Sequence, residues 1–169
     1  MSEDGFPDAR WGSASNPLRG VIDAFAATSL GSRCVRALVP LDRRLLSATK
    51  GRYTVLGPFG LQVLVLTTIG RKSGQRRQSP LIYTRDEDRL YLFGSNFGQA
   101  AHPAWSSNLL ANPDAWVTMG GSEIPVRATR LEGGEYDRAS ELFDTYLKAY
   151  PAYRTRTDRE IRVFALNRR

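Results

Sequence analysis

The sequence has one cysteine, Cys34, and one histidine, His102, among its 169 residues. A single cysteine excludes an internal disulfide, and the pair is too small for a Cys/His metal site. No apolar run reaches the roughly 18 residues of a membrane-spanning helix. The acidic, polar start MSEDGFPDARWG lacks the layout of a secretory signal. These absences predict a cytoplasmic protein that binds no metal.

Acidic residues are also scarce, at 17 against 24 Lys and Arg, which gives a net charge of +7. This excess predicts an anionic partner, and arginine in particular suits phosphates and carboxylates. A phosphorylated small molecule, a nucleic acid and an acidic membrane face all remain open, as does an ordinary basic surface. The sequence also lacks GxGxxG after a strand, a Walker loop, HExxH and GxSxG, so nucleophilic or metal catalysis is not expected.

The length of the chain predicts one domain. Residues 1–15 are expected to form a disordered or loosely attached arm, and residues 16–169 a single domain that starts with two helices. Asn16 and Pro17 suit the start of the first helix. The second helix is expected at about 32–48, kinked or divided by Pro40. The arginines of these helices can rest on a membrane surface or simply face solvent while the helices pack on the domain.

Six strands follow from the apolar runs and their turns. They are expected at 61–68, 79–85, 89–95, 115–119, 123–131 and 161–166, with helices at 103–111 and 134–150. Because short turns join most neighbouring strands, the sheet is predicted to be mainly antiparallel, and so many strands in a small domain tend to close into a barrel. The predicted fold class is therefore α+β, a barrel of about six strands with flanking helices.

Three stretches carry candidate chemistry. In the first, Gly70 and Gly74 bracket Arg71, Lys72 and Ser73, so that cations, a hydroxyl and backbone N–H groups converge on a phosphate or carboxylate. The alternative is a solvated hairpin loop, although mutual repulsion among four cations within residues 71–77 disfavours it.

The second stretch, residues 94–109, is a polar, glycine-rich loop that enters a helix. Phe97 and Trp105 can flank an aromatic ligand there, or Trp105 can belong to the core. In the third, residues 150–161, Tyr150 and Tyr153 stand among arginines; tyrosine suits contact with a planar substrate, but these two can equally be core residues. No catalytic partner for His102 is suggested by the spacing of residues around it, so His102 is interpreted as structural.

Taken together and in this order, the three stretches resemble the deazaflavin-dependent (coenzyme F420-using) nitroreductase family of the split β-barrel flavin-binding superfamily. The resemblance covers about residues 50–166. It rests on "TTIGRKSGQRRQSPLIY", "GSNFGQAAHPAWSSNLLANPDAWV" and "YPAYRTRTDREIRVFAL".

The resemblance implies a split β-barrel that holds coenzyme F420 in a groove. The positions that it implies for the cofactor are Arg71, Lys72, Ser73, Arg77, Pro80, Leu81, Ser95, Asn96, Phe97, Gly98, Trp105 and Asn108. Among these, Lys72 and Arg77 match cations that hold the phosphate and acidic tail. Tyr150 and Tyr153 match tyrosines on the substrate side and are the candidate catalytic residues.

Five positions depart from the family pattern. Phe97 stands where the family usually has glycine, Ser106 replaces a common tyrosine, and Ile82 replaces a tyrosine of some members. Arg156 stands at a third tyrosine position of the nitroreductase prototype, and Arg162 replaces a proline. These departures leave the cofactor prediction intact and weaken the prediction of a nitro substrate.

The sequence therefore predicts an oxidoreductase that transfers a hydride from reduced coenzyme F420 to an activated alkene, a quinone or a nitro compound. The alternative within the superfamily is a barrel that binds FMN, haem or the deazaflavin without turnover, with FMN as the less favoured cofactor. A nucleic-acid-binding barrel is disfavoured because strands 61–68 and 89–95 are mainly apolar. A homodimer and a peripheral contact of the N-terminal helices with the inner membrane face are further expectations.

Overall fold

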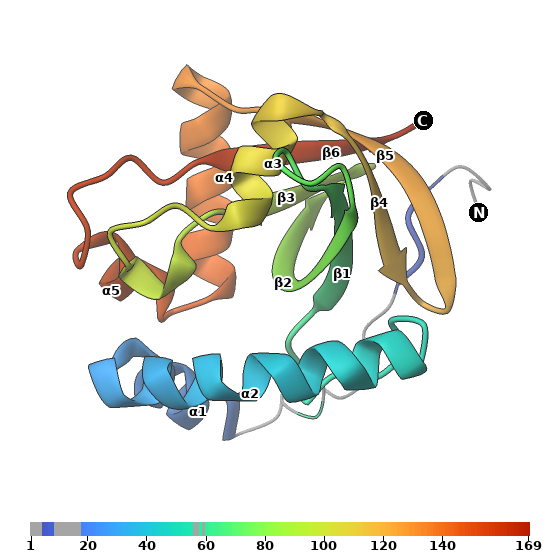
Figure 1. Ribbon diagram of the computed structural model, residues 1–169. Helices are drawn as coiled ribbons and strands as arrows, with labels where there is room; N and C mark the ends of the chain where they lie inside the picture. The colour runs from blue at the N-terminus through green and yellow to red at the C-terminus, as the bar shows by residue number, and fades with distance from the viewer. Residues whose placement is uncertain (1–4, 9–17, 56–57, 59) are drawn as a thin grey trace.

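The fold is a closed barrel of six strands, seen in a computed structural model that describes residues 5–8, 18–55, 58 and 60–169. Its strands are β1 (Val63–Ile69), β2 (Arg76–Asp86), β3 (Arg89–Phe93), β4 (Asp114–Met119), β5 (Ser122–Arg130) and β6 (Val163–Arg168). They pair in the order β1-β2-β3-β6-β5-β4, every pair is antiparallel, and β1 pairs with β4 to close the barrel (Figure 1). The predicted fold class is confirmed.

Strand β1 is buried on both faces, which explains its unbroken run of apolar residues. Leu64 and Leu66 point into the barrel core, whereas Val63 and Val65 pack outside it against Leu46. Successive side chains of a strand point to opposite faces, so this double burial requires a covering layer outside β1. That layer is the second helix of the chain.

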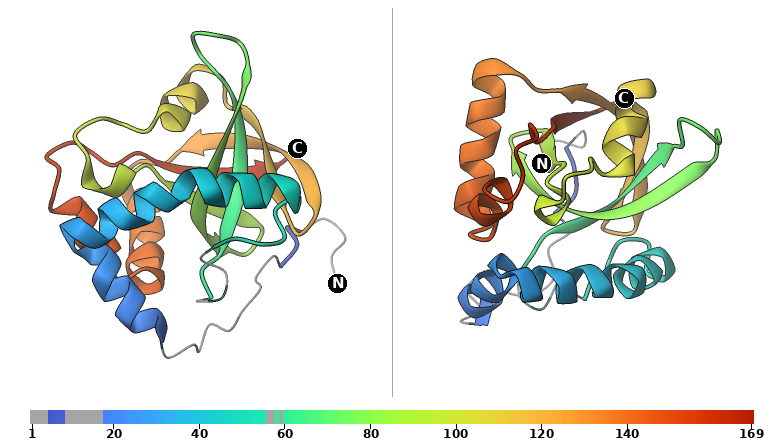
Figure 2. Two further views of the ribbon diagram at one scale, coloured as in Figure 1. Left: turned by 60° about the horizontal axis from the view of Figure 1, so that its bottom comes forward. Right: turned by 60° about the vertical axis from the view of Figure 1, so that its left-hand side comes forward.

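Two helices cross the barrel on one side, α1 (Leu18–Ala27) and α2 (Ser29–Ala48) (Figures 1 and 2). Thr28 separates them and caps α2, because its Oγ1 accepts from the N–H of Gly31 at 2.9 Å. Pro40 lies inside α2 and does not divide it, contrary to one of the two expected outcomes. The expected helix start at residues 16–17 lies outside the described residues. Within the described part of the chain, no helix has the length and apolar character needed to cross a bilayer.

The helices that follow the strands are α3 (Ala104–Ala111), α4 (Gly133–Tyr146) and α5 (Tyr150–Arg154), with a short 3-10 turn, η2 (Asn96–Gly98). The sequence predicted one helix over 134–150, but Leu147 leaves the helical conformation at φ −124°. Pro151 has no N–H to bond back to residue 147, so it begins a new helix more readily than it continues an old one.

Part of the predicted arm is fixed to the barrel. Phe6 is only 3% exposed and belongs to the barrel core. Its carbonyl oxygen accepts from the guanidinium of Arg85 at 2.6 Å, and that of Gly5 accepts from Arg168 at 2.9 Å. Residues 1–4 and 9–15 of the arm lie outside the described residues, so the arm as a whole stays a prediction.

The burial of Phe6 makes a stability prediction. We expect Phe6→Ala to lower the free energy of unfolding by about 3 kcal/mol, because it removes a ring from a closed core. Leu18→Ala is the matched control, since Leu18 is 56% exposed and should cost much less. Urea unfolding of both variants measures the difference. Equally small losses of unfolding free energy in the two variants would show that the Phe6 ring lies outside the core.

Candidate functional site

A cavity of about 450 Å³ lies between helices α1 and α2, strand β2 and the segment that joins β3 to α3. This volume is in the range of small-molecule sites. Seven residues that the sequence predicted for the site contribute to its lining: Pro80, Leu81, Ser95, Asn96, Phe97, Trp105 and Tyr153. They come from segments far apart in the sequence, and the fold brings them together.

Strand β2 forms one side of the cavity through residues 78–82. The hydroxyl of Ser47 on α2 donates to Oε1 of Gln78 at 3.0 Å and ties the helix to this strand. Pro80 and Leu81 then present apolar surface, and Pro80 has no N–H to leave unpaired. The side of the cavity made by β2 is therefore suited to a flat, apolar group.

Loop 94–102 forms the second side and is held in an unfavourable conformation. Asn96 and Phe97 have φ of 48° and 56°, in the left-handed region, which costs roughly 1–2 kcal/mol for a residue with a Cβ. Phe97 is the position at which the family usually has glycine, and its backbone conformation explains that preference. Its ring packs edge to face against the ring of Tyr153, with the two ring centroids 5.8 Å apart. The unfavourable conformation at residue 97 thus places an aromatic ring on the cavity.

The guanidinium of Arg159 holds this loop. It donates to the carbonyl oxygens of Gly94 at 2.9 Å, Ser95 at 2.8 Å and Gln99 at 3.0 Å. It also lies 3.2 Å from Nδ1 of His102, which lines the cavity. Burial lowers the pKa of Arg159, and Arg162 lowers it further. Even so, a guanidinium stays protonated at neutral pH, so it serves only as a donor.

Helices α1 and α2 form the third side and are fastened to α5. The hydroxyl of Tyr153 donates to the carbonyl oxygen of Ala26 at 3.0 Å. Arg156 donates to the carbonyl oxygen of Ala27 and, at 3.2 Å, to the hydroxyl of Ser32. Gly98 allows this arrangement, because a Cβ there would lie 2.7 Å from Cβ of Arg156. Gly98 therefore acts through close packing and does not line the cavity.

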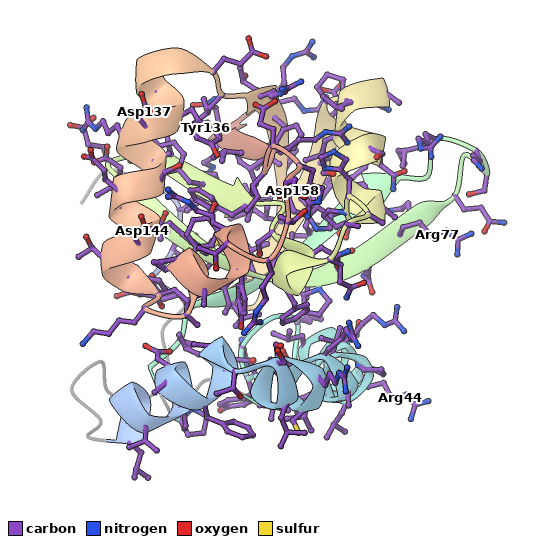
Figure 3. All side chains as sticks on the ribbon, turned by 90° about the vertical axis from the view of Figure 1, so that its left-hand side faces the viewer. Arg44, Arg77, Tyr136, Asp137, Asp144 and Asp158 are labelled. Carbon is purple, nitrogen blue, oxygen red and sulfur yellow. The ribbon has the colours of Figure 1, made fainter. Side chains whose placement is uncertain are left out.

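Four more predicted residues, Arg71, Lys72, Ser73 and Arg77, do not line the cavity. They are exposed on the hairpin between β1 and β2, which projects from the barrel (Figure 2). Gln78 already lines the cavity, so the cationic residues adjoin it without entering it. Figure 3 shows Arg77 on this hairpin and Arg44 on α2 extending toward the same edge of the molecule.

Asn108 supports the cationic hairpin from behind. It is buried, donates to Oγ1 of Thr68 at 3.0 Å and accepts from the N–H of Arg71 at 3.1 Å. Gly70 allows the turn to close, since a Cβ there would lie 2.7 Å from Oγ of Ser73. Asn108 is thus a support of the hairpin, and it does not line the cavity.

The two predicted catalytic tyrosines have different positions. Tyr153 lines the cavity, and burial raises its pKa to about 12. Tyr150 is fully buried, packs against Phe93 and Phe143, and does not line the cavity. Burial also raises the pKa of Tyr150, and its hydroxyl has no hydrogen-bond partner among the described residues. Of the two, only Tyr153 is placed to touch a ligand in the cavity.

Comparison with known proteins identifies the family. The model of the F420H(2)-dependent quinone reductase family matches residues 38–168. The chain belongs to this family. An F420H(2)-dependent quinone reductase of Mycobacterium tuberculosis is 32% identical over 135 residues, which are 78% of this chain and 91% of the relative.

Two solved structures agree with the barrel. An F420-H2-dependent reductase has 34% identity and a TM-score of 0.58, covering 62% of this chain and 93% of its own. A structure described as a domain-swapped dimer has 31% identity and a TM-score of 0.59. The match covers 80% of this chain and 98% of the chain in that structure. The chain is therefore an oxidoreductase that uses coenzyme F420, as its sequence predicted. The nitroreductase label is corrected, since the family that matches is that of the quinone reductases.

Sequence reasoning missed three parts of this candidate site. His102 was interpreted as structural, Arg159 was one of several arginines in its stretch, and α1 with the first part of α2 was not assigned to the site. Residues 18–37 also lie outside the family match, although Ile22, Ala26 and Val35 line the cavity. The one sequence signal that could have placed His102 at the cavity is its closeness in sequence to Trp105 in the second stretch.

The positions of the tyrosines make a paired prediction. Tyr150→Phe should leave turnover unchanged and keep or raise the free energy of unfolding by about 1 kcal/mol, because it removes an unpaired buried hydroxyl. Tyr153→Phe should lower that free energy by about 1 kcal/mol through loss of the bond to Ala26. It should also lower turnover. Urea unfolding and steady-state assays of both variants test this, and a slower Tyr150→Phe enzyme would contradict the assignment.

Proposed function

We propose that this enzyme reduces a quinone in the cavity with a hydride from reduced coenzyme F420. The observation that carries the proposal is the adjacency of a largely apolar cavity and a cationic hairpin in a member of this family. A quinone is flat, apolar and uncharged, which suits the apolar surface of Pro80 and Leu81. The charge of Lys72 and Arg77 suits the anionic part of the cofactor.

The chemistry of the described residues fits coenzyme F420. Its deazaflavin ring is flat, whereas its phosphodiester and glutamate tail are anionic and hydrophilic. In this proposal, loop 94–102 and Trp105 bind the ring, and Arg71, Lys72 and Arg77 bind the phosphate and tail outside the cavity. The bound cofactor supplies the hydride; the chain binds, orients and excludes water.

Tyr153 has the role of orienting the acceptor. Its pKa of about 12 keeps the hydroxyl protonated at neutral pH, and the proton is shared with the carbonyl oxygen of Ala26. A phenol with so high a pKa is a poor proton donor, so we assign it positioning in preference to proton transfer. The α1–α2 side that it fastens then limits the access of water to the acceptor.

The proposal predicts charge-dependent cofactor binding. Lys72→Ala and Arg77→Ala should weaken F420 binding about 10-fold at low salt, with less loss at high salt, because the contacts are exposed and screened. Fluorescence titration measures this dissociation constant. Arg127→Ala is a matched control, since Arg127 is exposed on β5 and pairs with Asp114. The control should bind F420 as the wild type does.

The same titrations test the function. Wild type should bind F420 more tightly than FMN or haem. It should oxidise reduced F420 when a quinone is added and not without an acceptor, as measured by absorbance. Preferred binding of FMN or haem, or no quinone-dependent oxidation, would favour the alternative of a barrel that binds without turnover. A nitro compound and an activated alkene, tested beside the quinone, decide among the acceptors that the sequence left open.

We further propose that the outer face of α1 and α2 contacts an anionic lipid surface, the source of an apolar quinone. Leu18, Val21 and Phe25 of α1 are 45–65% exposed, and Leu30 and Leu41 of α2 are 65% and 55% exposed. Arginines 33, 36 and 44 of α2 are exposed and do not line the cavity, whereas the two acidic residues of the helices, at 23 and 42, are buried. Exposed apolar side chains beside unopposed cations favour an anionic interface.

Vesicle sedimentation tests this contact. The enzyme should pellet with vesicles that contain phosphatidylglycerol, and much less with pure phosphatidylcholine. Leu30→Gln combined with Leu41→Gln should reduce the bound fraction several-fold, whereas Leu110→Gln, a change at an exposed leucine of α3, should not. Equal loss in both variants would argue against this face. The homodimer expected from the sequence stays a prediction that sedimentation without lipid can measure.

A further inference from the structure

His102 is the one histidine of the chain, and its ring is held by a donor that cannot accept. Nδ1 lies 3.2 Å from a guanidinium nitrogen of Arg159. Because arginine only donates, Nδ1 must accept, and it must therefore carry no proton. In a neutral imidazole, the remaining proton is then on Nε2. The contact with Arg159 thus selects a single tautomer, Nε2–H.

The charges around the ring keep it neutral. Burial lowers the pKa of His102, and Arg162, Arg159 and Arg130 lower it further, against a smaller opposing effect of Glu160. The imidazole is accordingly uncharged at neutral pH, with one donor and one acceptor. The acceptor is used by Arg159, and within the described residues no group accepts from the donor.

The donor belongs to a residue that lines the cavity. His102 contributes to the lining together with Ser95, Phe97 and Trp105, which the proposed function assigns to the cofactor. Arg159 also binds the carbonyl oxygens of residues 94, 95 and 99, so the ring and the loop are held by one group. A rigid, neutral donor of this kind suits a carbonyl oxygen better than a phosphate, which prefers a cation.

We propose that His102, fixed as its Nε2–H tautomer by Arg159, donates a hydrogen bond to a carbonyl oxygen of the ligand in the cavity. The inference rests on the proposed function for the identity of that ligand, which is the deazaflavin ring or the quinone. Both present ring carbonyl oxygens. Arg159 is then a positioning residue, which acts through His102 and the loop.

Two amide variants separate the donor from the acceptor. In His102→Gln the amide nitrogen reaches about as far as Nε2, so it keeps the donor to the ligand. In His102→Asn the amide reaches only about as far as Nδ1, so it keeps the acceptor for Arg159 and loses the donor. If the ligand is the deazaflavin, His102→Asn should weaken F420 binding about 10-fold in the absence of quinone, and His102→Gln by no more than about 3-fold.

If the ligand is the quinone, F420 binding should be unchanged in both variants. The kcat/KM for quinone should then fall about 10-fold in His102→Asn and little in His102→Gln. Equal losses in both variants, or no loss in either assay, would overturn the proposal. Failure of the wild type to bind F420 would instead defeat the proposed function, so the two failures are distinguishable.

Nitrogen NMR of the enzyme without a histidine tag gives a readout that is independent of activity. With one histidine, the ring nitrogens need no assignment by mutation. Wild type at neutral pH should show the Nε2–H tautomer and a pKa below the ordinary value. In Arg159→Lys the fork that binds Nδ1 and the loop is lost, so the tautomer preference should weaken and the pKa should rise. A wild-type ring in the Nδ1–H form would contradict the inference.

Discussion

The guanidinium of Arg159 has three loop carbonyl oxygens within 3.0 Å, and the rest of the site depends on that contact. Loop 94–102 contains two consecutive non-glycine residues with positive φ, a conformation that would relax without an external partner. Carbonyl oxygens that converge on one planar fork provide that partner. The position of Phe97, and with it the shape of the cavity, follows from a residue more than fifty positions later in the chain.

The helical side of the cavity comes partly from residues outside the family match. Ile22, Ala26 and Val35 precede the match, whereas Leu38, Val39 and Arg43 of α2 lie within it. Tyr153 of α5 and Arg156, which follows α5, fasten this side. Arg156 stands where the nitroreductase prototype has a third tyrosine, and its contacts with Ala27 and Ser32 give this difference a physical reason. A tyrosine would lack the forked donor that reaches two groups of the α1–α2 connection. Arg156 thus connects the segment after α5 to the N-terminal helices.

The sequence predicted the barrel well because its signals are local. Apolar runs such as Leu61–Thr68 and turns such as Gly120–Gly121 define strands and their antiparallel order without knowledge of distant contacts. The predicted helix over 134–150 was divided at Leu147, because periodicity does not show where Pro151 ends one helix and begins another. Pro40, by contrast, was accommodated within α2.

The candidate site was predicted less completely, because its residues are defined by long-range contacts. Pro80, Ser95 and Trp105 line the cavity as the resemblance implied. Tyr150 matched the same pattern and is buried behind the cavity, since a motif records residue types and not the direction of each side chain. His102 was dismissed for want of a nearby partner, and its partner, Arg159, is 57 residues away.

The hairpin cations Arg71, Lys72 and Arg77 lie outside the cavity, and this has a consequence for how the enzyme can vary. The cations of the hairpin are exposed, so the effect on cofactor affinity that the proposed function gives them would be long-ranged and sensitive to salt. Contacts inside the cavity are short-ranged and depend on shape, as at Phe97 and Tyr153. Under the proposed function, we therefore expect substitutions in the hairpin to change the affinity for the anionic cofactor with little effect on the acceptor. Substitutions of the apolar residues of α1 and α2 that line the cavity are expected to change the acceptor side with little effect on the affinity for the anionic tail. The two properties could then change independently within one barrel.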